Sequence, residues 1–279
     1  KINNRSSHTT LATRSGGVSI FLSLLIISFY FYLNDLDIFE YSLIIPLSLL
    51  LVVGLYDDVY KMDFKLKFIF QIIAAKIMID NGFIIDNLHG VLWINEMNRV
   101  LAQLFTIFII VAIINSINFI DGIDGLGLSV VLIFIGFFEF FSAELTPFIN
   151  LSLLIFTSSI GLFYFNFKKN KKIFLGDSGS LLLGGIVSLY IVYILSQDYI
   201  IRPEYDIHKI LFVVSILPLP IIDMIRIVMI RLRNRKSPFE ADKNHLHHLI
   251  LSKTKNHLFT TLAIAFATLF LILIFQIIF

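Results

Sequence analysis

Residues 99–127 read RVLAQLFTIFIIVAIINSINFIDGIDGLG. The first part, 99–117, is an almost uninterrupted apolar run, about as long as a helix must be to cross the hydrocarbon core of a bilayer. A helix satisfies its own backbone hydrogen bonds, so this run predicts a membrane-spanning helix. The run ends in Asn, Asp and Gly residues, which suit a polar site at the membrane boundary.

Similar apolar runs recur along the whole chain. Of its 279 residues, 57% are hydrophobic and only 15% are charged, which is more apolar surface than a soluble domain of this size can bury. We therefore expect an all-α polytopic membrane helix bundle that forms one integral membrane domain over residues 1–279. About nine spans are expected, at 15–33, 41–56, 67–85, 99–117, 125–142, 147–166, 179–197, 207–230 and 257–279.

The third of these spans contains two charged residues, Lys76 and Asp80, spaced i, i+4. We expect them to pair with each other or to face the interior of the bundle. Before the first span, the stretch from Lys1 to Arg14 is polar and basic. It is neither a signal peptide nor a span, so either the chain begins in a cytoplasmic segment or an upstream helix has been lost.

Lys and Arg are distributed unevenly between the two sides of the membrane. With the N-terminus in the cytoplasm, 18 of the 22 lie in cytoplasmic segments and only Arg99, Arg202 and Lys209 lie outside. Cytoplasmic loops are enriched in Lys and Arg, so this orientation is predicted. The net charge of +2 is too small to indicate a nucleic-acid-binding protein, and the absence of cysteine excludes disulfides, thiolate catalysis and Cys-bound zinc.

Polar clusters lie at the predicted cytoplasmic ends of the spans. The first is GLYDD, residues 54–58, followed by Lys67. Asp57 and Asp58 repel each other and are costly at a membrane boundary unless a cation or a proton stabilises them, as in a site for Mg²⁺ and phosphate. The alternative is a solvated helix end in which Asp pairs with Lys.

The second cluster is NSINFIDGIDGLG, residues 115–127. Asn115, Asn118, Asp121 and Asp124 recur every third residue, which brings neighbours onto roughly one helix face. Their oxygens could then converge on a hard cation or a sugar hydroxyl. The alternative is a polar turn with Asx caps.

The third cluster, FLGDSGS at 174–180, opens a span directly after the basic run 168–172. A Gly- and Ser-rich helix start presents free N–H groups to phosphate, and Asp177 could hold a bridging Mg²⁺. Phe174 could stack on a base. The alternative is an ordinary Asp or Ser N-cap.

The fourth cluster, KSPFEADKNHLHH at 236–248, lies in the longest cytoplasmic loop. His245, His247 and His248 could ligate zinc, donate to a diphosphate or act as acid–base groups near neutral pH. Their spacing cannot place all three on one helix face, so phosphate recognition is preferred to zinc, and a solvated loop stays open. Asp223 and Arg226, three residues apart, are interpreted as a structural ion pair.

Together, GLYDD, NSINFIDGIDGLG, FLGDSGS and SPFEADKNHLHH resemble the polyprenyl-phosphate N-acetylhexosamine-1-phosphate transferases of glycosyltransferase family 4. The resemblance covers about residues 5–250. The HLHH form is more similar to the undecaprenyl-phosphate N-acetylglucosamine-1-phosphate transferases than to the muramoyl-pentapeptide translocases, which have three consecutive His. Family members usually have one more helix before Arg5, so we expect one N-terminal helix fewer here.

The resemblance implies a reaction in which a polyprenyl phosphate displaces UMP from a UDP-N-acetylhexosamine, with Mg²⁺ required. It implies a multi-pass enzyme of the bacterial plasma membrane that initiates lipid-linked cell-envelope polysaccharide synthesis, such as lipopolysaccharide or cell wall polymers, with a cytoplasmic active site. By motif, the implied catalytic residues are Asp57, Asp58, Asp121, Asp124, His247 and His248, the substrate-binding residues are Lys67, Asn115, Phe174, His245 and Asn166, and the metal ligands are Asp177 and Asn118.

Other functions stay open at this point. A muramoyl-pentapeptide-type translocase would use a different UDP-sugar. A secondary transporter would place ionisable groups near the bilayer midplane, whereas the acidic clusters here lie at one interface. A truncated, non-catalytic member of the family and a homodimer are also left open.

Overall fold

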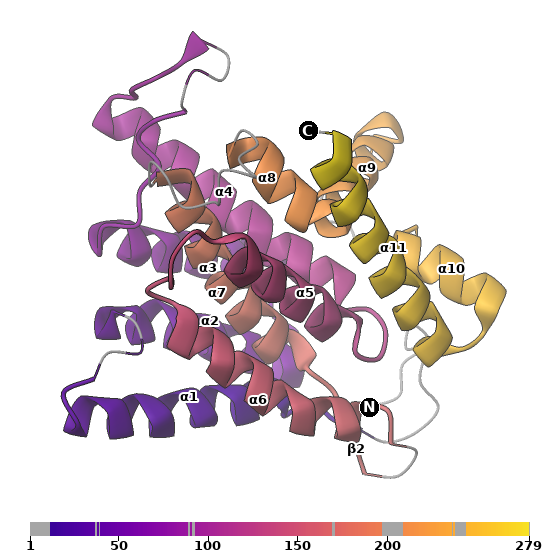
Figure 1. The fold of residues 1–279 in the computed structure, drawn as a ribbon. Helices are drawn as coiled ribbons and strands as arrows, with labels where there is room; N and C mark the ends of the chain where they lie inside the picture. Colours follow the sequence, from indigo (N-terminus) through magenta and orange to yellow (C-terminus); the bar gives the residue numbers. More distant parts are fainter. Residues whose placement is uncertain are drawn as a thin grey trace.

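The computed structural model describes residues 12–36, 38, 40–88, 90, 93–168, 171–196, 209–235, 237 and 244–278. These residues form the helix bundle of Figure 1, with one short pair of parallel strands. In chain order the elements are β1 (Ala12–Thr13), α1 (Gly16–Leu33), η1 (Tyr41–Leu43), α2 (Ile44–Tyr60), α3 (Phe64–Asp80), α4 (Arg99–Ile120), α5 (Leu126–Phe141), α6 (Ile149–Asn166), β2 (Lys172–Ile173), α7 (Gly176–Ser196), α8 (Lys209–Ile216), α9 (Pro218–Arg233), α10 (Leu246–Thr254) and α11 (His257–Ile278).

Helix α7 is the centre of the bundle. It packs against α1, α2, α4, α5 and α8. Of its most apolar 18-residue stretch, 94% is buried inside the structure. Small residues let the neighbouring backbones approach closely, as is common between helices in membranes. A Cβ atom at Gly54 would lie 2.4 Å from Ser178 Cα, and one at Gly184 would lie 2.8 Å from Ile114 Cα. The start of α7 is therefore held tightly between other helices.

Each predicted span corresponds to helical structure, but not every one is a single long helix. Six helical segments in the described part of the chain are long and apolar enough to cross a bilayer: Gly16–Leu33, Tyr41–Tyr60, Arg99–Ile120, Ile149–Asn166, Gly176–Ser196 and His257–Phe275. The span expected at 207–230 is instead α8 and α9, bent by 95° at Pro218. Proline lacks the N–H that would continue the helix.

Within the described residues, length and composition therefore support six spans, or seven if the bent pair is one span, rather than the nine expected. The difference arises from the bend and from α3 and α5, which have only 17 and 16 residues. Lys76 and Asp80 form the expected i, i+4 ion pair, and both side chains stay partly exposed. The short helix α10 lies in a segment that was expected to be a loop.

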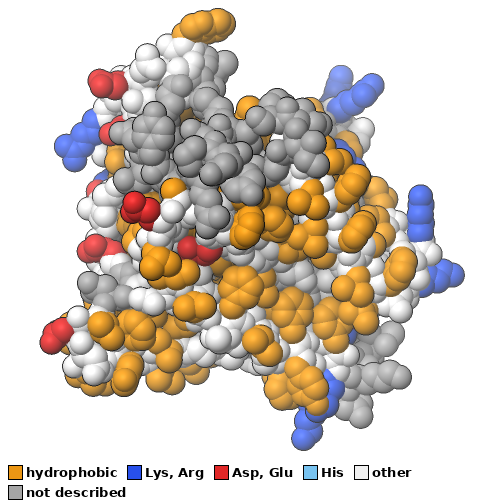
Figure 2. Space-filling model, viewed as in Figure 1, with side chains coloured by type: hydrophobic (Ala, Val, Ile, Leu, Met, Phe, Trp, Pro, Cys, Tyr) orange, Lys and Arg blue, Asp and Glu red, His pale blue; other side chains and the backbone are white. Residues whose placement is uncertain are grey.

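The surface matches that of a multi-pass membrane protein. Figure 2 shows hydrophobic side chains over the middle of one face, with Lys and Arg mainly at its right and lower edges and Asp and Glu at its left. In the same orientation, β2 lies at the lower right of Figure 1. The basic side chains thus gather near the end of the bundle where the predicted polar clusters lie.

Candidate functional site

The start of α7 is held by a carboxylate from α2. Asp58 Oδ1 accepts a hydrogen bond from Asp177 N at 3.1 Å, and Asp58 Oδ2 accepts one from Ser178 N at 3.0 Å. The first N–H groups of a helix have no partner within the helix, and the helix dipole favours a negative charge there. Gly176, with φ +74°, is needed here because a Cβ atom would lie 2.7 Å from Asp58 Oδ2. Asp58 is therefore a cap for α7.

Arg14 is a second partner of Asp58, which sequence reasoning missed as a site residue. Its Nη1 atom lies 3.1 Å from Asp58 Oδ1 and 3.9 Å from Asp177 Oδ2. Pairing of β1 with β2 and the hydrogen bond from Gly16 N to Phe174 O, at 3.0 Å, bring this segment to the start of α7. The Gly16–Gly17 pair, which follows Arg14 after Ser15, was the available signal for such a close approach.

Lys67 joins two of the predicted clusters. Its Nζ atom lies 2.7 Å from Asp57 Oδ2, 2.8 Å from Asp177 Oδ1 and 3.5 Å from Asn118 Oδ1. The side chain is only 13% exposed, so water screens these charges weakly. Asp57 also accepts a hydrogen bond from Met62 N at 2.8 Å. Residues from α2, α3, α4 and α7 thus meet around one ammonium group.

The two asparagines of α4 have different environments. Asn118 Nδ2 donates to Asp177 Oδ1 at 2.8 Å and to Ser180 Oγ at 2.7 Å. Asn115 Nδ2 instead donates to Oε1 of the buried Gln71, at 2.6 Å. Asn118 therefore belongs to the acidic cluster, which we define as Asp57, Asp58 and Asp177 with the residues that contact them. Asn115 instead connects α4 to α3 next to this cluster.

Asp121 follows the last residue of α4 and adds a further carboxyl to this cluster. Removal from bulk water raises the pKa of Asp121 well above its usual value, and the carboxylates of Asp177 and Asp58 raise it further. A hydrogen bond from the backbone of Gly127 acts in the opposite direction. Asp121 is therefore less readily ionised in this cluster than an ordinary aspartate.

Asp124 has different contacts from Asp121. It is buried, and Oδ2 pairs with Lys172 and lies 3.4 Å from Nδ1 of His257, the first residue of α11. The hydroxyl of Thr261, also on α11, donates to the Asp124 backbone carbonyl at 2.7 Å. These contacts indicate that Asp124 anchors the 121–125 turn to β2 and α11, and its catalytic role stays a prediction. The pairing with Lys172 and His257 was missed because it joins distant segments.

The two residues expected to contact the nucleotide lie on either side of β2. The Phe174 ring is partly exposed, and Lys172 Nζ lies 5.2 Å from its centroid, in a cation–π arrangement. Asn166 is buried, and its Nδ2 donates to Ile173 O at 2.9 Å. Asn166 therefore holds the strand in this structure, and its contact with a nucleotide remains a prediction, as does stacking on Phe174.

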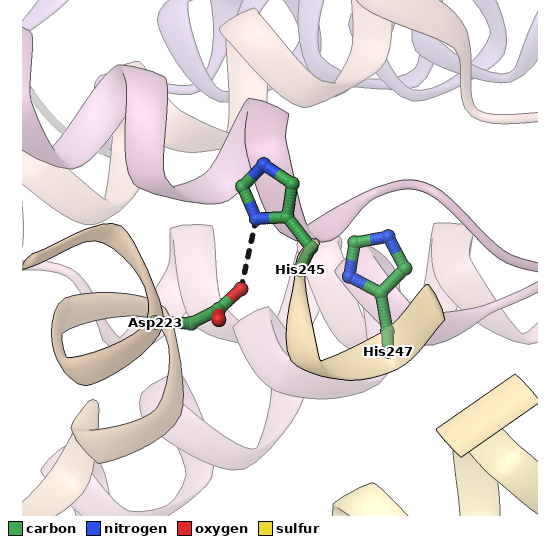
Figure 3. Close-up of side chains that lie close together, drawn as sticks. All are labelled: Asp223, His245 and His247. Atoms are coloured by element: carbon green, nitrogen blue, oxygen red, sulfur yellow. Dashed lines mark hydrogen bonds and ion pairs between the residues drawn. The ribbon is translucent and has the colours of Figure 1, made fainter. Parts of the chain in front are cut away.

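The three histidines of the fourth cluster lie at the start of α10, while Lys236 and residues 238–243 of that cluster are outside the described residues. His245 Nδ1 lies 2.9 Å from Asp223 Oδ2, a contact drawn as a dashed line in Figure 3. His247 is buried against the second cluster, where a Cβ atom on Gly122 would lie 2.2 Å from His247 Nε2. The ring centroids of His247 and the partly exposed His248 are 4.2 Å apart. Four predicted clusters therefore converge at one end of the bundle.

Burial decides the protonation of His247. Loss of water around the ring lowers the pKa of His247 to about 3, with smaller lowering effects from His248 and His245 and a raising effect from Asp223. In this conformation the His247 ring is neutral and enclosed, so it would not exchange a proton near neutral pH. The role that the resemblance gives to His247 stays a prediction.

Two groups of residues could hold a metal ion. Ligand atoms of Asp223, His245 and His247 all lie within 4.8 Å of one another, and such a group with two imidazoles suits zinc or nickel better than magnesium. Around Lys67 the donors are instead carboxylate and amide oxygens, which Mg²⁺ prefers. In this structure these oxygens contact the Lys67 ammonium group, which Mg²⁺ would have to displace, so Asp177 and Asn118 as magnesium ligands stay a prediction.

Known proteins with a similar sequence were also found. The family model described as Glycosyl transferase family 4 matches residues 40–195. A Bacillus subtilis protein named probable undecaprenyl-phosphate N-acetylglucosaminyl 1-phosphate transferase is 30% identical over 267 residues, which are 94% of this chain and 72% of that protein. The Pasteurella multocida undecaprenyl-phosphate alpha-N-acetylglucosaminyl 1-phosphate transferase is 34% identical over 265 residues, covering 90% and 70% of the two chains. The Mycobacterium tuberculosis decaprenyl-phosphate N-acetylglucosaminephosphotransferase is 29% identical over 280 residues, covering 91% and 69%.

Proposed function

The chain belongs to glycosyltransferase family 4, and we propose that it transfers N-acetylglucosamine 1-phosphate, or a similar N-acetylhexosamine 1-phosphate, from a UDP-sugar to a polyprenyl phosphate. In this reaction an oxygen of the polyprenyl phosphate bonds to the sugar-bearing phosphorus of the UDP-sugar. The bond from that phosphorus to the bridging oxygen breaks, and UMP leaves with the electron pair. The named relatives, which act on undecaprenyl or decaprenyl phosphate, support this choice of acceptor.

One observation carries the proposal, namely the meeting of Asp57, Asp177 and Asn118 around the Lys67 ammonium group. Phosphoryl transfer brings two anions together and depends mainly on positioning and on neutralising charge. Lys67 and Arg14 provide fixed positive charge at the start of α7, while the nearby oxygens can take a cation. The same residues would be poorly matched to an uncharged substrate.

Asp177 and Asn118 would hold Mg²⁺ in this proposal. When bound there, Mg²⁺ supplies positive charge that offsets the diphosphate and favours departure of UMP. Phe174 is proposed to stack on uracil, and Lys172 keeps its ammonium group beside that ring. His248 is proposed to contact the sugar nucleotide because it is the partly exposed neighbour of the buried His247.

The two adjacent aspartates have different proposed tasks. Both oxygens of Asp58 accept hydrogen bonds from the start of α7, and its side chain is 4% exposed. Asp57 is 18% exposed and pairs with the ammonium group of Lys67. Asp57 is therefore the better placed of the two to orient the acceptor phosphate or to keep it dianionic.

The proposed location is the bacterial plasma membrane, with the site facing the cytoplasm. The chain has no cysteine, so single cysteines can report on sidedness without background. We expect Lys168→Cys to react with an impermeant maleimide only in inverted vesicles and Trp93→Cys only in right-side-out ones, since both positions are exposed. The opposite pattern would refute the orientation.

The test of the reaction uses purified protein, undecaprenyl phosphate, Mg²⁺ and labelled UDP-N-acetylglucosamine. We expect label in the lipid extract, one UMP released per lipid product, and loss of both on chelation of Mg²⁺. Asp177→Asn should raise the Mg²⁺ concentration needed for half-maximal rate, whereas Asp80→Asn, in an ion pair of α3 away from the site, should not. Full Mg²⁺-dependent activity of Asp177→Asn would refute the metal assignment.

The donor is tested by competition. Several UDP-N-acetylhexosamines and UDP-muramoyl-pentapeptide are compared against one lipid acceptor. Preference for the muramoyl donor would replace the proposed sugar but keep the reaction. Substrate movement across liposomes without any lipid-linked product would overturn the transferase function itself.

A further inference from the structure

A further group of polar side chains, which includes Asp223 and His245, lies at the junction of α9 and α10, beside the proposed transferase site (Figure 3). Its centre is Asp223, a buried residue of α9 with 4% exposure. Asp223 Oδ1 accepts hydrogen bonds from Arg226 Nη2 at 2.7 Å and from Leu246 N at 3.1 Å. Asp223 Oδ2 lies 2.9 Å from His245 Nδ1. Both oxygens of this carboxylate are therefore engaged.

These contacts act on three consecutive residues before and at the start of α10. Arg226 donates to the Asn244 carbonyl, while Asp223 accepts from the His245 ring and from the Leu246 N–H. Leu246 is the first residue of α10, so its N–H has no partner within the helix. The Asp223–Arg226 pair thus holds the entrance to α10 in one position.

His245 extends the network to α4. Its Nε2 atom lies 3.4 Å from Nη2 of the buried Arg231, and the Arg231 guanidinium lies 5.6 Å from the centroid of the Phe119 ring. Phe119 is next to Asn118 in the acidic cluster. The His245 ring is therefore fixed on one side by Asp223 and on the other by groups that pack on α4.

The held segment presents His247 to the site. The His245 and His247 rings stack with centroids 5.5 Å apart and planes 19° apart. His247 in turn packs so closely on Gly122 that a Cβ atom there would lie 2.2 Å from Nε2. Gly122 follows Asp121 directly, so the position of α10 determines what lies against the Asp121 turn.

The same three side chains could be considered as a zinc site, because their ligand atoms lie within 4.8 Å of one another. However, both Asp223 oxygens already accept hydrogen bonds, and the guanidinium groups of Arg226 and Arg231 add positive charge beside them. A metal ion would have to displace these contacts and withstand the repulsion. The geometry fits an anchor better than a cation site.

We propose that Asp223 and His245 are positioning residues of the transferase site, which hold the start of α10 so that His247 stays packed against Gly122. The inference rests on the proposed transferase function for its catalytic consequence. The anchor itself is a property of the fold. Neither Asp223 nor His245 needs to touch the reacting atoms in this assignment.

The experiment combines kinetics with a spin label at Ser252→Cys on the exposed face of α10. We expect Asp223→Asn and His245→Phe each to lower kcat about 10-fold or more with the KM for the UDP-sugar changed less than about threefold. The double variant should be no worse than the more damaging single one, because both remove the same anchor. The label should become more mobile in each. Asp80→Asn, which removes a different ion pair within a helix, should change none of these values.

Three results would overturn the assignment. They are unchanged kcat in both variants, reduced kcat with an unchanged spin-label spectrum, and stoichiometric zinc in the purified protein that Asp223→Asn abolishes. If a variant unfolds, His245→Asn, which keeps a side-chain N–H for Asp223, should restore both the label spectrum and much of kcat. If the wild-type protein makes no lipid-linked product, the proposed function fails, while the label still reports whether α10 is anchored.

Discussion

Lys67 Nζ lies 2.8 Å from Asp177 Oδ1, although 110 residues separate the two in the sequence. The pair joins α3 to the start of the central helix α7 and is largely shielded from solvent. Its charges therefore interact more strongly than those of an exposed pair. Loss of either charge should disturb the site on both helices.

Lys67→Met should lower kcat/KM by about 100-fold, the size of effect seen when one hydrogen-bond donor is removed from a site that stabilises developing charge. The substitution keeps the apolar length of the side chain but leaves Asp57 and Asp177 without their shared cation. Transfer of label to the lipid phase measures the loss. Lys76→Met, in the exposed pair of α3, is the matched control and should retain full activity.

Asp57 and Asp58 should separate function from stability. Asp58→Ala removes two hydrogen bonds to the start of α7, so we expect the free energy of unfolding to fall by about 1–2 kcal/mol, as for the loss of a helix cap. Asp57→Asn keeps an oxygen for the Met62 N–H and should lose activity with little loss of stability. Denaturant titration in detergent micelles, alongside the transfer assay, compares the two. Equal destabilisation by both variants would contradict the division of tasks.

Gly122→Ala should reduce activity by about 10-fold or more. The added methyl group would lie 2.2 Å from His247 Nε2, so the His247 ring, or α10 with it, must shift away from the Asp121 turn. Gly161→Ala on α6 is the matched control, because nothing lies within 4 Å of its added Cβ and alanine favours a helix over glycine. Activity of the Gly122 variant equal to that of the Gly161 variant would show that the packing of His247 is unimportant.

His247 should make the protein sensitive to acid. Its pKa is about 3 in the folded chain, against 6.5 for an ordinary histidine, so the unfolded state binds the extra proton between these values. Stability contributed by the neutral ring is complete above about pH 6.5 and is lost progressively as the pH falls toward 3. The difference in unfolding midpoint between wild type and His247→Phe, measured from pH 7.5 to 5, isolates the pH-dependent stability that His247 contributes. If the difference between the two midpoints did not change with pH, His247 would not be an enclosed, neutral ring in the folded protein.

Much of the architecture could be predicted from local pattern. Apolar length alone placed helical segments at all nine expected positions, because a helix in a bilayer must satisfy its backbone within its own segment. The residues around Asp58, Asn118 and Asp177 could also be proposed together, since polar groups at the ends of spans are costly without partners. In the structure they do meet.

Other features could not be read from local pattern. The 95° bend at Pro218 and the short helices α3 and α5 lowered the number of clear spans, because hydropathy records composition and not the path of the backbone. Arg14 was missed because its partner Asp58 is reached only through the β1–β2 pairing. Sequence alone could not distinguish the enclosed His247 from the partly exposed His248 beside it.

The amino-acid order was thus enough to specify a membrane helix bundle, its charge asymmetry and the chemical types gathered at one end, since these depend on composition over short windows. Which carboxylate caps a helix, which pairs with a lysine and which histidine is enclosed depended on packing around α7 and α10. Such choices are made by contacts between segments far apart in the chain, where a change of about one ångström alters hydrogen bonding, solvation and charge interaction together.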